Sequence, residues 1–173
     1  MRRARWLIVL AIAMITMPLA AAQAQRTGAE PPPPAARNDS AFRALQARGA
    51  NVMGVDQYTS VHRFDTLHDG GRIVLQRIEE DSAGTQTIRQ HLRAIADAFG
   101  RGDFSMSREV HGMDVPGAAV LAERRAHITY EVRDVARGAE LRIRTTDAAA
   151  LKALRAFMEF QNADHRTGHR HHD

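Results

Sequence analysis

Three histidines lie where the sequence pattern predicts apolar side chains or an irregular loop. His62 lies two residues before Phe64 in a predicted β-strand, and His91 lies within the apolar stripe of a predicted helix. His111 follows in residues 102–117, which we expect to be irregular. Imidazole nitrogen is a ligand for copper and zinc, and thioether sulfur is a ligand for copper. These residue types predict a transition-metal site whose ligands are His62, His91, His111, Met113 and Met106.

The same histidines have a simpler interpretation, because a buried imidazole is often satisfied by a hydrogen bond to a backbone carbonyl. Their long spacings also differ from the short Cys/His pairs of structural zinc motifs. Val61 and Leu67 favour the strand register that would turn His62 away from the core, but we expect Phe64 and His62 to face inward. A shared metal then requires the imidazoles to lie within about 5 Å of one another, because metal–nitrogen bonds are about 2 Å long.

Residues 164–173, DHRTGHRHHD, are rich in histidine. Such a segment binds divalent metal loosely in any flexible chain. We expect a flexible tail here, which either collects metal or has no fixed function. Its histidines are His165, His169, His171 and His172. Two further histidines, His68 beside a predicted turn and His127 on a polar strand face, are expected to be exposed to solvent.

Residues 39–163 are predicted to form one α+β domain that contains a strand-turn-strand-helix pattern twice. In the first unit, residues 58–68 and 72–80 form strands joined at Asp69-Gly70-Gly71, a turn signal because glycine accepts positive φ. In the second unit, apolar residues alternate with charged ones at Ile128, Tyr130, Val132, Leu141 and Ile143. Shorter helices are expected to carry Phe42 and Leu45, ending at Gly49, and to start near Pro116.

A capped helix is expected to end each unit. The first begins at Asp81 or Ser82 and stops at Gly100, and the second is capped by Asp147. The buried stripe of the second helix is predicted to be Leu151, Leu154, Phe157, Met158 and Gln161. Laying Asp81 on Asp147 places His91 on Phe157. Two such units predict a four-stranded antiparallel sheet with helices packed on one face.

The N-terminal residues 1–24 have the pattern of a secretory signal peptide, with arginines at the start, an apolar run and an Ala22-Gln23-Ala24 end. A retained membrane anchor is the competing interpretation, but Pro18 and the small residues after it favour cleavage. Residues 25–38 contain four successive prolines and are predicted to be an extended linker. The mature chain is therefore expected in the periplasm, without membrane association.

Charge and cysteine content exclude several classes of protein. The chain has 24 basic and 20 acidic residues, and removal of Arg2, Arg3 and Arg5 with the signal leaves 24 − 3 = 21 basic residues, a net charge of +1. Nucleic-acid binding needs a clustered basic surface, so we expect no nucleic-acid partner. The chain has no cysteine, so its stability must come from a hydrophobic core rather than from disulfides.

Several segments resemble a family of small exported proteobacterial proteins, some of which carry the label aspartate carbamoyltransferase. The segments are NVMGVDQYTSVHRF, the DGG turn, IRQHLRAIADAFGRGDFS and FMEFQNADHRTGH. The resemblance implies export and a single compact domain. The enzyme label finds no support, because the Ser-Thr-Arg-Thr loop that holds carbamoyl phosphate is missing. No G-x-S-x-G, H-E-x-x-H, phosphate-loop or cysteine-nucleophile motif is present either, so no catalytic residue is assigned.

The sequence predicts an exported soluble protein that binds copper or zinc for storage, delivery or sensing. The alternative is a function of another class, in which the protein is a periplasmic interaction module that binds no metal and docks an envelope partner on its polar sheet face. Clustering of His62, His91 and His111 distinguishes the two, because only the metal site needs their imidazoles close together.

The signal-peptide pattern predicts that the mature chain begins at Gln25 and is recovered in the soluble exported fraction. Mass analysis of the N-terminus checks this cleavage position. An intact Met1 on membrane-bound material would show that the segment is a retained anchor.

Overall fold

The computed structural model describes residues 34–54 and 57–167, with side chains described from Ser40 onwards. The predicted signal peptide, most of the predicted linker and residues 168–173 lie outside the described residues. Among the helices that are described, none combines the length and the apolar character that crossing a bilayer requires.

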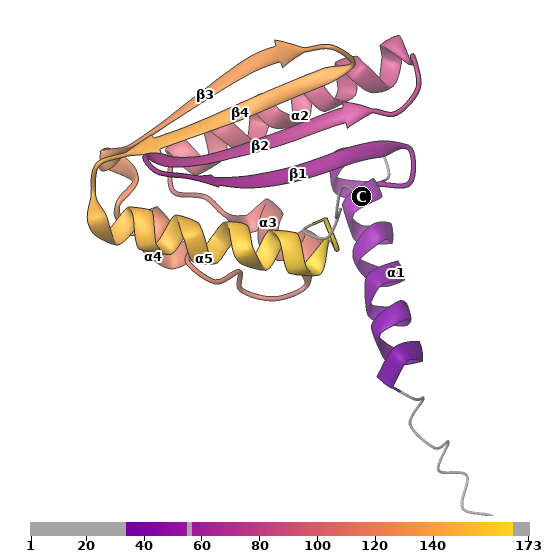
Figure 1. Cartoon of the computed structure of the whole chain (residues 1–173), viewed down its shortest axis with the longest axis horizontal. Coiled ribbons are helices and arrows are strands. Elements are labelled where there is room, and N and C mark those ends of the chain that lie inside the picture. The colour runs from indigo at the N-terminus through magenta and orange to yellow at the C-terminus, as the bar shows by residue number, and fades with distance from the viewer. Residues whose placement is uncertain (1–33, 55–56, 168–173) are drawn as a thin grey trace, which may run out of the picture. The chain divides into compact units, whose positions relative to one another are not determined.

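The chain forms a four-stranded antiparallel sheet and five α-helices in the part that the structure describes (Figure 1). The elements are α1 (Pro34–Met53), β1 (Ser60–Leu67), β2 (Gly70–Arg77), α2 (Ser82–Gly100), α3 (Ser105–His111), α4 (Ala118–Glu123), a 3₁₀ turn at Arg125–His127, β3 (Ile128–Val135), β4 (Gly138–Thr145) and α5 (Ala148–Asp164). The strand order is β1-β2-β4-β3. This arrangement confirms the predicted α+β class and the two strand-turn-strand-helix units.

The two units meet at the central strand pair, β2 and β4. Ile73 lies opposite Leu141, and these residues hold the same place in their strands, so the pairing is close to two-fold symmetric. Gly70 and Gly138 hold matching places at the strand starts. A Cβ atom at Gly70 would collide with the carbonyl oxygen of Ile143, and one at Gly138 would collide with that of Leu75. Both glycines therefore allow the close backbone approach that joins the units.

Helices α2 and α5 start at the predicted aspartate caps. The Asp81 carboxylate accepts a hydrogen bond of 3.0 Å from the backbone N–H of Gly84, and Asp147 accepts one of 2.8 Å from that of Ala150. Such caps satisfy backbone donors that a first helical turn otherwise leaves unpaired. Each helix crosses to the other unit, because α2 packs on β3 and β4 while α5 packs on β1 and β2.

The core lies between the helices and one face of the sheet. Its side chains come from alternate strand positions, such as Ile73 and Leu141, and from the helix stripes that include Leu92 and Phe157. Phe64 is buried on this face and His62 is buried beside it in the same alternation, which confirms the inward register expected for β1.

Several local predictions were wrong. The first hairpin turns at His68 and Asp69 rather than at Asp69-Gly70-Gly71, because both glycines lie within β2. There Gly70 allows the close approach of β4, and Gly71 leaves room for Met158 of α5. Residues 34–38 of the predicted linker belong to α1, which continues past Gly49 to Met53. The segment expected to be irregular contains the helix α3.

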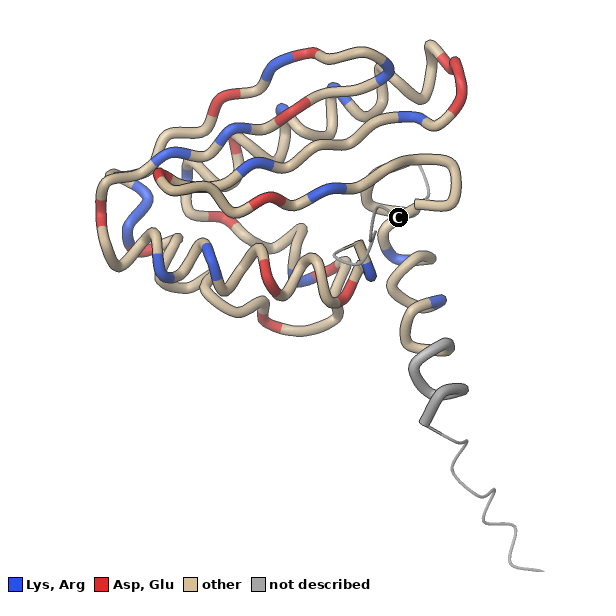
Figure 2. Tube along the Cα trace, in the orientation of Figure 1, with Lys and Arg blue, Asp and Glu red and all other residues tan. Residues whose placement is uncertain are grey.

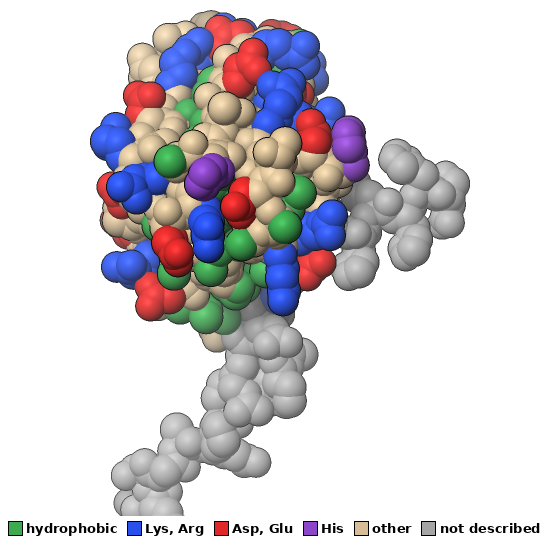
Figure 3. Space-filling view, turned by 90° about the vertical axis from the view of Figure 1, so that its left-hand side faces the viewer, with side chains coloured by type: hydrophobic (Ala, Val, Ile, Leu, Met, Phe, Trp, Pro, Cys, Tyr) green, Lys and Arg blue, Asp and Glu red, His purple; other side chains and the backbone are tan. Residues whose placement is uncertain are grey.

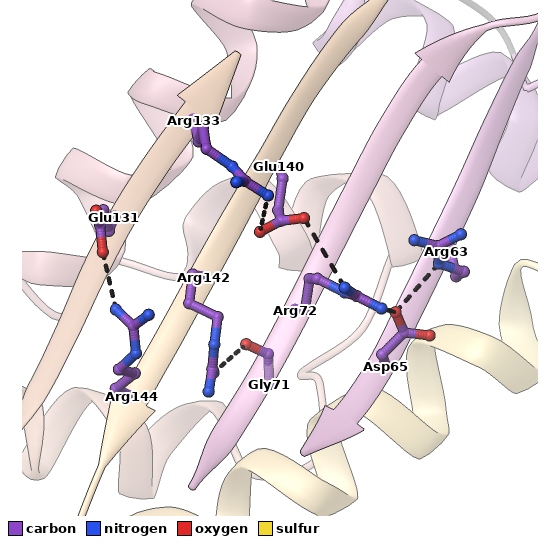
Figure 4. A network of polar contacts seen from close by, with 9 residues as sticks. All are labelled: Arg63, Asp65, Gly71, Arg72, Glu131, Arg133, Glu140, Arg142 and Arg144. Atoms are coloured by element: carbon purple, nitrogen blue, oxygen red, sulfur yellow. Dashed lines mark hydrogen bonds and ion pairs between the residues drawn. The ribbon is translucent and has the colours of Figure 1, made fainter. Parts of the chain in front are cut away.

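The outward face of the sheet carries a lattice of ion pairs (Figure 4). Asp65 bridges Arg63 and Arg72, with nitrogen–oxygen distances of 3.1 and 2.6 Å. Glu140 bridges Arg72 and Arg133, with distances of 4.0 and 3.4 Å. Basic positions lie on all four strands and acidic ones on β1, β3 and β4 (Figure 2), and both signs also mix on the end of the molecule seen in Figure 3. The outward face of the sheet is therefore polar, and most of its charges are paired with an opposite charge on the same face.

Phe157 is central to the core, so its replacement with alanine should lower the free energy of unfolding by about 3–5 kcal/mol. Arg155→Ala is the matched control on the exposed side of the same helix, and its effect should stay within about 0.5 kcal/mol. Chemical denaturation measures both. A loss below about 1 kcal/mol for Phe157→Ala would contradict its place in the core.

Candidate functional site

A cavity of about 70 Å³ lies between the first hairpin and helices α1, α2, α3 and α5, and four histidines line it. Three of them, His62, His91 and His111, were predicted as ligands, and Met106 lines the same cavity. The fourth is His165, which the sequence had placed in a flexible tail. Met113 is 52% exposed and does not line the cavity. The other lining residues are Val52, Met53, Phe64, Ile73, Leu75, Ile95, Phe99, Ser107, Val110, Phe157 and Gln161.

His62 and His111 each use ring nitrogens in hydrogen bonds. Nε2 of His62 lies 3.0 Å from the hydroxyl oxygen of Ser60. Nδ1 of His111 donates to the Asp164 carboxylate over 2.5 Å, and its Nε2 lies 3.0 Å from the amide oxygen of Gln161. The Asp164 contact joins the end of α3 to the end of α5. His111 is therefore both a wall of the cavity and a link between two helices.

His165 follows the last residue of α5 and is only 6% exposed. Its position is fixed by Gln57, whose amide nitrogen donates to the His165 carbonyl oxygen over 2.7 Å. The amide oxygen of Gln57 accepts from Gln46 and lies 2.9 Å from Nδ1 of His165. Because that oxygen can only accept, Nδ1 carries the ring proton and Nε2 carries the lone pair. The tail prediction was thus wrong for residues 164–167, which these contacts hold against the domain.

The His165 ring is the centre of the histidine cluster. Its centroid lies 5.5 Å from that of His62 and 5.2 Å from that of His111. Two imidazoles that share one tetrahedral metal have centroids roughly 5 Å apart, given metal–nitrogen bonds of about 2 Å. The spacing therefore suits a shared ion. Nevertheless, the described residues contain no group of three His, Asp or Glu side chains already placed to hold a metal. Hydrogen bonds direct Nε2 of His62 and both ring nitrogens of His111 to protein partners.

Burial keeps two of the cavity imidazoles neutral. Burial lowers the pKa of His91 to about 4. Burial, with smaller contributions from the charges of His62 and His111, lowers the pKa of His165 to about 3. His91 makes no hydrogen bond to any residue that the structure describes.

The histidine cluster occupies the place that an aromatic cluster has in the other unit. His62 is the third residue of β1 and Tyr130 is the third residue of β3. Phe99 and His165 lie equally far from their helix caps, Asp81 and Asp147. The Phe99 and Tyr130 rings are 6.0 Å apart, so the His62–His165 pair is their counterpart. Extending the alignment of the repeats to Phe99 would have identified His165 from the sequence.

The remaining histidines lie away from the cavity. His68 and His127 are exposed, as expected. His169, His171 and His172 lie outside the described residues.

Comparisons with family models, with curated proteins and with solved structures found no match to this chain. The resemblance to a proteobacterial family therefore stays a prediction, and the chemistry of the cavity rests on its own residues.

The lowered pKa of His91 predicts a pH dependence of stability. Between about pH 6.5 and pH 4 the unfolded chain binds a proton at His91 that the folded chain does not, so unfolding becomes easier as the pH falls. This residue should contribute a slope of up to about 1.4 kcal/mol per pH unit. His91→Leu should reduce the slope, whereas the exposed control His127→Leu should not. Denaturant titrations across this range measure it, and equal slopes for wild type and His91→Leu would contradict the burial of a neutral His91.

Proposed function

We propose that this chain is an exported protein that binds a transition metal, copper or zinc, in the histidine-lined cavity, for storage, delivery or sensing. The observation that carries the proposal is that four imidazoles and the thioether of Met106 line one small cavity. Copper and zinc both bind imidazole nitrogen, and copper also binds thioether sulfur.

The internal repeat supports a chemical role for the histidines. At the matching position of the other unit, the fold is packed by Phe99 and Tyr130. Aromatic rings therefore fill this position with one buried polar atom, the Tyr130 hydroxyl, whereas two imidazoles there carry four ring nitrogens whose desolvation costs free energy. Two imidazoles in place of that aromatic pair are therefore best explained if their nitrogens bind a ligand such as a metal ion.

The contacts around His165 also resemble the surroundings of a metal-binding histidine. Such a residue typically donates its second ring N–H to an oxygen acceptor, which fixes the tautomer and the ring orientation. Gln57 is this acceptor, and Gln46 in turn orients Gln57. Export of the protein is supported by the signal pattern of residues 1–24, and the periplasm is where we place its metal exchange.

A second candidate function is an interaction module without metal, in which the outward sheet face docks an envelope partner. The ion pairs around Asp65 and Glu140 favour this function. They give the outward face arginines from all four strands and carboxylates from β1, β3 and β4 (Figure 4). These charges already pair with each other, and exposed ion pairs of this kind contribute only about 0–1 kcal/mol each. A partner would have to replace those pairs, so this function takes second place.

Metal addition should stabilise the folded domain if the cavity is a binding site. The chain to test ends at Thr167, because this keeps the buried His165 and removes the three tail histidines that would bind metal themselves. At a hundredfold excess of metal over its Kd, the gain should be about 2.7 kcal/mol, measured by thermal or chemical unfolding with Cu or Zn.

Two variants and one control make the assay specific. His165→Phe copies the residue of the other unit, and His91→Leu removes an imidazole without a described hydrogen bond. Both should abolish the gain, while the exposed His127→Leu should keep it. If the wild type gains nothing from either metal, the metal function is wrong and the interaction module takes first place.

A further inference from the structure

The lining of the cavity indicates which of its nitrogens can reach an ion. Nε2 of His62 pairs with Ser60, and both ring nitrogens of His111 face Asp164 and Gln161. Nε2 of His165 is different, because the contact to Gln57 takes Nδ1 and no described residue bonds Nε2. His165 therefore presents a lone pair on a nitrogen whose ring is held from the opposite side.

His91 and Met106 also bring ligand atoms to the lining, a ring nitrogen and a sulfur, that no described residue bonds. Both are half-buried, and they reach the cavity from different helices, α2 and α3. Met53 also lines the cavity, but it is packed in the hydrophobic core cluster, whereas Met106 is not part of that cluster. A flexible thioether outside the packed core is free to turn toward an ion.

The charge of the cavity lining affects which oxidation state of a bound metal ion it favours. The lining contains neither Asp nor Glu, and most of its other side chains are apolar, including Phe64, Leu75 and Phe99. Burying an ion among neutral ligands in apolar surroundings costs more for a divalent than for a monovalent ion. Thioether and imidazole ligands in such a site favour Cu(I), which accepts a low coordination number, over Zn(II).

We propose that the ion of this site is Cu(I), bound by Nε2 of His165, a ring nitrogen of His91 and the sulfur of Met106. This inference rests on the proposed metal-binding function and specifies the ion and its ligands.

Competition assays with a coloured chelator test the ligand set, using Cu(I) without oxygen and Zn(II) separately, on the chain that ends at Thr167. The wild type should bind Cu(I) more tightly than Zn(II). Met106→Leu keeps the side-chain volume and should weaken Cu(I) binding by about tenfold or more while leaving Zn(II) binding unchanged. Met113→Leu, on an exposed side chain outside the cavity, should change neither affinity. X-ray absorption of the copper form should show one sulfur ligand, which Met106→Leu removes.

The outcomes separate this inference from the function on which it rests. Binding of zinc without Cu(I) would leave the metal function in place and overturn the Cu(I) assignment. Unchanged Cu(I) affinity in a folded Met106→Leu, or its loss in Met53→Leu instead, would overturn the role of Met106. If neither ion binds, the metal function itself fails.

Discussion

The close pairing of β2 with β4 is the constraint on which the rest of the structure depends. Gly70 and Gly138 let each strand pass against a carbonyl oxygen of the other, so the two hairpins become one sheet. The sheet then offers a single apolar face, and α2 and α5 each pack across the strands of the opposite unit. This crossing brings the end of α5 beside β1, where His165 meets His62.

The cavity exists where the two units stop being alike. On one side the repeat packs Phe99 and Tyr130, and on the other it holds His165 and His62 at matching positions. Imidazoles are smaller than phenyl rings and bring nitrogens that need partners, so this side combines leftover space with polar groups. Ser60, Gln57, Gln161 and Asp164 satisfy most of those nitrogens. The nitrogens without a described partner belong to His91 and to Nε2 of His165, and the proposed metal function depends on them.

Much of this framework follows from local sequence signals. The caps Asp81 and Asp147 and the alternation at Ile128, Tyr130 and Val132 are local features, because a cap or a strand face depends on neighbouring residues. His62 could be placed inward from its spacing to Phe64. Composition alone could not place His165, because a histidine-rich chain end is typical of a flexible tail. Its burial depends on Gln57, a distant partner that no local pattern indicates, so only the alignment of the two repeats could have placed it.

The metal content of the protein tests the central claim most directly. The chain ending at Thr167, with its signal segment retained for export and no affinity tag, would be purified from the exported fraction of cells supplied with copper. Elemental analysis should find about one copper per chain, as expected for a single site. Copper below about a tenth of the chain concentration, with zinc equally low, would contradict a metal site in the histidine-lined cavity.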